Sequence, residues 1–182
     1  MILGFELNEE IVLWTARFAL VLYLLRGWFD FRGWRAGEPQ DSAKVARRLW
    51  TVGCCCFLAH VLSAFTLVHN LSHAAAYEHT ALRTAAVIGI HWGGGIYVNH
   101  AFTVFWVADV VLWWVKGPAW AYRSRLYYWG VQGLFAFMFL NATIIFGPPY
   151  WGKITIVLAG TFAVLSVVAE WRQKSMSKND NI

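Results

Sequence analysis

Residues 49–73 read LWTVGCCCFLAHVLSAFTLVHNLSH, a predominantly apolar run that decides the fold class of the chain. The run contains no Asp, Glu, Lys or Arg over 25 residues. A helix of about 20 mostly apolar residues is long enough to cross the hydrocarbon core of a bilayer. The run is therefore predicted to span a membrane, with its histidine-containing end near one membrane surface.

The composition of the whole chain supports the same interpretation. Of the 182 residues, 59% are hydrophobic and 14% are charged, whereas about 25% are charged in an ordinary soluble domain. We expect an all-α integral membrane protein, a five-transmembrane-helix bundle that forms a single membrane domain over residues 1–182. The predicted spans are residues 11–29, 49–73, 96–115, 126–146 and 154–171. A shorter apolar stretch, Ala81–Ile90, is predicted to be an interfacial or re-entrant helix between spans 2 and 3.

The basic residues are distributed unequally between the two ends of these spans. Of the 15 Lys and Arg residues, 12 fall at one set of ends and two fall at the other. The 12 are Arg26, Arg32, Arg35, Lys44, Arg47, Arg48, Lys116, Arg123, Arg125, Arg172, Lys174 and Lys178. Because cytoplasmic loops collect Lys and Arg, the amino terminus is expected outside and the carboxyl terminus in the cytoplasm, with Asp30–Arg48 as a sizeable inner loop. A bacterial inner membrane is the expected location. The net charge of +5 is thus explained by topology and does not indicate a nucleic-acid partner.

All six histidines lie between positions 60 and 100. His69 and His73 are four residues apart, which is the spacing that shares one helical face, and His100 begins the next span at a comparable depth. These three are predicted to converge on one ligand, with His79 and His91 as weaker members. Imidazole suits Zn²⁺ and copper, and two facing histidines are also the axial ligands of a b-type haem. Hydrogen-bonded packing histidines are the structural alternative.

Other polar side chains are expected in two layers of the bundle. Arg17, Asn99 and Asn141 are predicted within about 10 Å of the outer boundary, where they would support the histidine site. His60 and Asp109 both lie about 20 Å from that boundary. These two are predicted to form a buried pair, because each makes the other less costly to bury.

Three classes of function are compatible with these residues. The first is an outward-facing histidine site that binds a transition metal or haem, in electron transfer or metal handling. The second is a non-catalytic structural or assembly subunit that contacts other membrane subunits as well as the lipid bilayer. The third is a transporter for a small solute or metal ion, which the scarcity of polar groups in the inner halves of the spans disfavours. An enzyme is not favoured, because the sequence contains no motif of a catalytic nucleophile.

Overall fold

The computed structural model describes residues 2–36, 39–122, 124–145, 150, 152–154, 156–157, 160–161 and 164. The chain divides into two compact units, Met1–Gln132 and Gly133–Ile182, and each unit is described by itself. The described residues form helices joined by turns and contain no strand. The predicted all-α fold class is therefore confirmed for this part of the chain.

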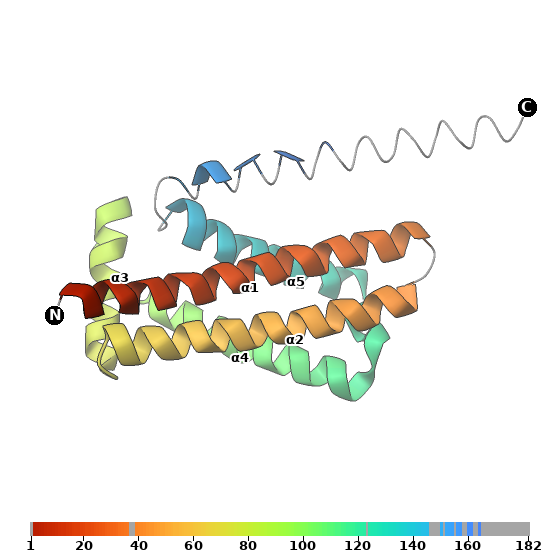
Figure 1. Cartoon of the computed structure of the whole chain (residues 1–182), viewed down its shortest axis with the longest axis horizontal. Helices are drawn as coiled ribbons and strands as arrows, with labels where there is room; N and C mark the ends of the chain where they lie inside the picture. Colours follow the sequence, from red (N-terminus) through yellow and green to blue (C-terminus); the bar gives the residue numbers. More distant parts are fainter. Residues whose placement is uncertain are drawn as a thin grey trace, which may run out of the picture. The chain divides into compact units, whose positions relative to one another are not determined.

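The helices follow one another closely along the sequence (Figure 1). In chain order they are α1 (Ile2–Ala36), α2 (Pro39–Ser63), the π-helical η1 (Ala64–Val68), α3 (His73–Ile88), α4 (Gly95–Lys116), the 3-10 helix η2 (Pro118–Tyr122), α5 (Arg125–Leu140) and the π-helical η3 (Asn141–Ile145). The boundary between the two units falls within α5.

Three of the described helical segments are long and apolar enough to cross a membrane. They are Asn8–Arg32, Ser42–Val68 and Gly95–Lys116, and they correspond to the first three predicted spans. The predicted span 126–146 is helical through α5 and η3 up to Ile145. The predicted span 154–171 lies mostly outside the described residues. The chain is thus a helical protein with membrane-spanning segments.

The predicted inner loop Asp30–Arg48 is wrong. The helix α1 continues to Ala36 and α2 begins at Pro39, so both flanks of the expected loop are helical. Arg26 and Asp30 lie one turn apart on α1, and such a pair stabilises a helix. Pro39 is the first residue of α2, a position where proline is favoured because its missing N–H has no helical partner to lose.

The expected short helix is present as α3, although it begins earlier than Ala81. Ser72 caps its start by accepting a hydrogen bond from the backbone nitrogen of Ala75 at 3.2 Å. Gly89 ends it in a left-handed conformation with φ of 76°. With 16 residues, α3 is about 24 Å long, which is less than the roughly 30 Å hydrocarbon core. Figure 1 shows α3 running across the end of the α1–α2 pair.

Aromatic side chains form the core of the first unit. The helices α1 and α2 pack side by side as an antiparallel pair, and α4 packs against α2 (Figure 1). Between α2 and α4, the rings of Trp50 and Trp106 are 5.0 Å apart, and those of Phe57 and Phe102 are 5.2 Å apart in an edge-to-face contact. The close approach depends on Gly53, since a Cβ there would lie 3.2 Å from the Trp106 ring. These contacts fix the antiparallel register of α2 and α4.

The turn between α3 and α4 requires glycine at position 93. A Cβ on Gly93 would lie 2.3 Å from the backbone oxygen of Tyr77, which belongs to α3 and cannot swing away. We expect Gly93→Ala to destabilise the protein by about 1–3 kcal/mol, the usual cost of overpacking. Gly27→Ala is the control, because no atom lies within 4 Å of its added Cβ and alanine favours the helix. Thermal unfolding in detergent measures both, and equal midpoints would contradict the close approach.

Candidate functional site

The sequence around His69 forms a turn where a continuous helix was expected. The helix η1 ends at Val68, and Asn70 and Leu71 then adopt left-handed conformations with φ of 49° and 59°. His73 begins α3. The expectation that His69 and His73 share one helical face is therefore wrong. A left-handed leucine is rare, and both strained residues and π-helical turns concentrate at functional sites.

This turn nevertheless brings four histidines into two pairs, and three of the four lie around one phenylalanine ring. The ring centroids of His69 and His79 are 5.2 Å apart, and those of His73 and His100 are 5.9 Å apart. The ring of Phe65 lies 6.3 Å from His69, 6.5 Å from His73 and 6.2 Å from His100. We call these four histidines and Phe65 the histidine cluster. It comprises two pairs of imidazoles, and the weaker predicted member His79 belongs to one of them.

The spacing within each pair suits a shared metal ion. Metal–nitrogen bonds of about 2 Å place two imidazole centroids about 5 Å apart at a tetrahedral angle and about 6 Å apart when they are opposed. The observed 5.2 and 5.9 Å fall in this interval. Among the described residues, however, no group of three His, Cys, Asp or Glu side chains is close enough to hold a metal ion. Each pair therefore offers two protein ligands, and further ligands would come from water or from movement of the other pair.

A haem fits this arrangement less well than a metal ion. The macrocycle of a haem bound by His73 and His100 would extend in the plane midway between the two imidazoles. Phe65 is almost equally distant from both, at 6.5 and 6.2 Å, so its ring lies close to that plane. Binding of a haem would require Phe65 to move away, whereas binding of a single ion would not.

The surroundings of His69 favour its neutral form. This residue follows the membrane-spanning segment that ends at Val68. Burial lowers the pKa of His69, and the neighbouring His79 lowers it further. A neutral imidazole is the form that binds a metal. His91, in contrast, lies outside the cluster, where its Nε2 is 3.0 Å from a carboxylate oxygen of Glu78.

The predicted supporting residues have other contacts. The Arg17 guanidinium lies 3.9 Å from Glu10 and 4.8 Å from the Trp14 ring centroid. Asn99 is exposed on α4, and its backbone oxygen accepts a hydrogen bond from Thr103. Asn141 belongs to the second unit, where its Nδ2 donates to the backbone oxygen of Phe137 at 2.7 Å.

The structure does not bring His60 and Asp109 together. His60 Nδ1 lies 2.9 Å from the backbone oxygen of Val12, and Asp109 accepts its hydrogen bonds elsewhere. The reason is the register of α2 and α4, in which Trp50 lies beside Asp109. His60 is ten residues further along α2, which is about 15 Å along the helix axis.

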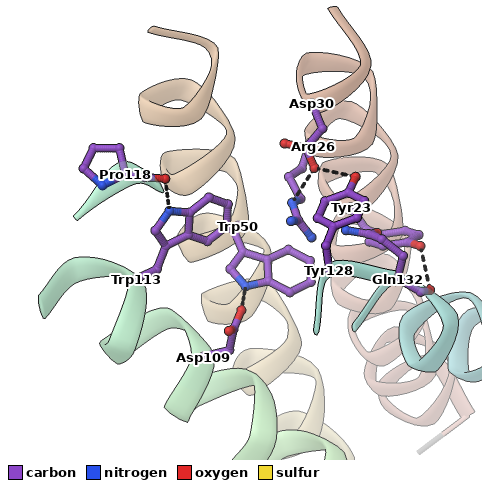
Figure 2. A network of polar contacts seen from close by, with 9 residues as sticks. All are labelled: Tyr23, Arg26, Asp30, Trp50, Asp109, Trp113, Pro118, Tyr128 and Gln132. Atoms are coloured by element: carbon purple, nitrogen blue, oxygen red, sulfur yellow. Dashed lines mark hydrogen bonds and ion pairs between the residues drawn. The ribbon is translucent and has the colours of Figure 1, made fainter. Parts of the chain in front are cut away.

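A buried ion pair that the sequence analysis missed lies in the first unit (Figure 2). Arg26 Nε is 3.1 Å from Asp30 Oδ2, and the two residues are only 1% and 2% exposed. The hydroxyl of Tyr128 donates to the same carboxylate oxygen at 3.1 Å. The spacing of four residues between Arg26 and Asp30 was the available signal. From the sequence, Arg26 is counted among the basic residues that indicate topology and Asp30 is placed at the start of the inner loop, so the two are not paired.

Aromatic rings and an amide enclose the Arg26 guanidinium. Its Cζ lies 4.3 Å from the Trp50 ring centroid and 5.1 Å from that of Trp113. In the amide orientation that satisfies both neighbours, the Gln132 side-chain oxygen accepts from the two terminal nitrogens of Arg26 at 2.6 and 3.2 Å. The Tyr23 hydroxyl donates to the backbone oxygen of Gln132 at 3.3 Å. The charge is thus held among aromatic rings, with the Asp30 carboxylate as its ion-pair partner and the Gln132 amide as its hydrogen-bond acceptor.

A second buried carboxylate, Asp109, lies beside this cage. Its Oδ2 accepts from Trp50 Nε1 at 2.8 Å, and its Oδ1 accepts from the Tyr127 hydroxyl. Tyr127 and Tyr128 are consecutive on α5, and they bind carboxylates on α4 and α1 respectively. The first two turns of α5 therefore connect two other helices. Hydrogen bonds from other helices occupy both carboxylates, so the arrangement is suited to holding helices together.

The fold and these two polar centres define a helical membrane protein with a histidine cluster at one end and a buried ion pair toward the other. No protein-family model matches the chain, and no curated protein or solved structure is similar to it.

The buried ion pair generates a prediction about stability. Asp30→Asn leaves the buried Arg26 charge without its counter-ion, and removal of one partner of a buried pair costs about 3–5 kcal/mol. The double variant Arg26→Met/Asp30→Leu should lose less than the sum of the single losses. Glu10→Gln is the control, since its contact with Arg17 is 3.9 Å and the Glu10 side chain is 57% exposed. Thermal unfolding measures these three variants and the single variants Arg26→Met and Asp30→Leu, and equal effects of Asp30→Asn and Glu10→Gln would contradict a stabilising role.

Proposed function

We propose that this chain is a five-span protein of a bacterial inner membrane whose outward-facing histidine cluster binds a transition-metal ion, Zn²⁺ or copper, in metal handling or electron transfer. The observation that carries the proposal is the arrangement of four imidazoles in two pairs, at centroid distances of 5.2 and 5.9 Å, with Phe65 beside three of them. The amino terminus lies outside and the carboxyl terminus in the cytoplasm in this proposal, as the basic residues indicate.

The histidines of the cluster are available to a ligand. Within the described part of the chain, no hydrogen-bond partner meets the ring nitrogens of these four residues. Hydrogen-bonded packing histidines would each show such a partner. His73 and His79 are exposed and His69 and His100 are partly exposed, so an ion from solvent can reach them. Imidazole nitrogen is a ligand that suits both zinc and copper.

A non-catalytic subunit of a larger membrane complex is the second candidate. The observation that favours it is that no three ligating side chains converge within the described residues. In that case, the histidines and the neighbouring aromatic rings would contact another protein. Elemental analysis and an absorption spectrum of the purified protein separate the candidates. A stoichiometric metal supports the first, a Soret band indicates haem, and the absence of both favours the subunit.

Metal binding is expected to depend on both pairs of the cluster. His79→Ala and His73→Ala each remove one imidazole from a pair, and each should weaken binding by about tenfold or more, since even a partner that only orients a ligand contributes about 10–100-fold. His91→Ala should leave the affinity unchanged, because His91 contacts Glu78 outside the cluster. Titration of the purified protein with Zn²⁺ and with Cu²⁺ measures the effect. Equal affinity of all three variants would place the metal elsewhere.

The proposed orientation is tested with reporter fusions. A reporter that is active only in the cytoplasm should be active after Ile182 and silent when it is inserted near Pro149. The expected difference follows from the basic residues, 12 of which fall on the cytoplasmic side. The reverse pattern would move the histidine cluster to the cytoplasmic face, and equal activity at both positions would exclude a span between them.

A further inference from the structure

The end of the first unit that lies away from the histidine cluster carries an excess of basic side chains. The exposed members are Arg32 on α1, Lys44 and Arg48 on α2, Lys116 on α4 and Arg125 on α5. The described carboxylates toward this end are Asp30 and Asp109, which are 2% and 3% exposed and are already bound by neighbouring side chains. In the described part of the chain, no carboxylate pairs with Arg32, Arg48, Lys116 or Arg125.

One arginine at this end is held in a fixed position. The Cζ atom of Arg47 lies 3.9 Å from the centroid of the Trp114 ring. Trp114 Nε1 donates to Thr51 Oγ1 at 2.9 Å, and the same hydroxyl donates to the backbone oxygen of Arg47 at 2.9 Å. Each of the three residues thus contacts the other two, with the ring coming from α4 and the guanidinium and the hydroxyl from α2. We call Arg47, Thr51 and Trp114 the arginine seat.

The guanidinium of this seat has unused hydrogen-bonding capacity. Arg47 Nε is shielded from solvent and has no hydrogen-bond partner in the described part of the chain, while the residue as a whole is partly exposed, so a ligand would reach it through the terminal nitrogens of the guanidinium. No described carboxylate pairs with Arg47 either, so its contact with the Trp114 ring is its stabilising interaction. A guanidinium that is stacked on a ring presents its N–H groups at the ring edge, in the planar fork that matches a phosphate. Stacking also lowers the conformational freedom that the side chain loses on binding.

The location of the seat indicates which phosphate it meets. Trp114 is 49% exposed and lies two residues before the end of α4, at Lys116, where this membrane-spanning helix ends. Tryptophan rings favour the headgroup level of a bilayer. Basic groups immediately outside membrane-spanning helices attract anionic lipids. A soluble nucleic acid or acidic protein would not explain a half-exposed ring at that level.

We propose that the arginine seat binds the phosphate of an anionic phospholipid, with Lys116 and the neighbouring basic side chains supplying further attraction. The seat is separate from the histidine cluster, and this inference does not depend on metal binding. The proposed ligand is an anionic lipid, and its proposed site is the surface around Arg47 and Trp114.

The experiment compares two adjacent arginines of equal charge. The full chain is reconstituted in nanodiscs of phosphatidylcholine with a minority of phosphatidylglycerol, and native mass spectrometry gives the ratio of the two lipids that remain bound. The wild-type protein should be enriched in phosphatidylglycerol. Arg47→Gln should reduce the enrichment by about fivefold or more, because it removes the hydrogen bonds of the planar fork as well as the charge. Arg48→Gln removes the same charge one residue away and should change the enrichment by less than half as much.

Each outcome decides the proposal. Equal losses in Arg47→Gln and Arg48→Gln would show a diffuse attraction without a seat, and no enrichment in the wild type would remove the lipid altogether. Both variants are first compared by thermal unfolding in pure phosphatidylcholine. If Arg47→Gln does not assemble, Arg47→Lys replaces it, since lysine keeps the charge and loses the planar fork. Wild-type enrichment in Arg47→Lys would then overturn the seat.

Discussion

The structure of the first unit depends on the burial of one ion pair, Arg26 with Asp30. A buried charge pair is stabilising only when further hydrogen bonds satisfy its remaining donors and acceptors. Here these partners come from different helices: Trp50 on α2 lies over the guanidinium, and Tyr128 and Gln132 on α5 supply polar contacts. Because these three side chains must reach the ion pair, they fix where α2 and the beginning of α5 lie against α1. In an apolar setting, this constraint is more specific than the packing of aliphatic side chains, which interdigitate in many registers.

Asp109 extends the same constraint to α4. Trp50 contacts both centres, because its ring lies over Arg26 while its Nε1 donates to Asp109. The consecutive residues Tyr127 and Tyr128 then divide between the two carboxylates. Four helices are thus connected through side chains that lie within one region of the unit. At the opposite end, the backbone departs from α-helix in η1 and in the left-handed residues Asn70 and Leu71.

The sequence predicted the elements that depend on composition and failed for those that depend on tertiary contacts. The predicted span 96–115 differs from α4 by one residue at each end, because an apolar run bounded by Gly94 and Gly117 is a local signal. The pairing of His69 with His73 assumed a continuous helix, and periodicity does not reveal a π-helical turn. Asp109 was recognised as a buried acid, yet its partners depend on the register between α2 and α4, which Gly53 and the aromatic rings determine. Of the proposed site, the residue types and the approach of His73 to His100 were predictable from the sequence, whereas the pairing of His69 with His79 was not.

The two ends of the first unit differ in how they respond to a ligand. The helix α4 belongs to both, since it carries His100 near its start and Asp109 and Trp114 toward its end. At its end, hydrogen bonds from Trp50 and Tyr127 hold Asp109, so displacement there breaks buried polar contacts, which is costly. At its start, α4 follows a turn through Gly93 and lies near the left-handed residues Asn70 and Leu71. Small movements of the backbone there break few hydrogen bonds. If His73 and His100 adjust around a metal ion, the movement is therefore expected to stay within the histidine cluster. The hydrogen bonds that hold Asp109 resist a shift of α4 as a whole, which would be needed to carry the movement to the other end of the unit.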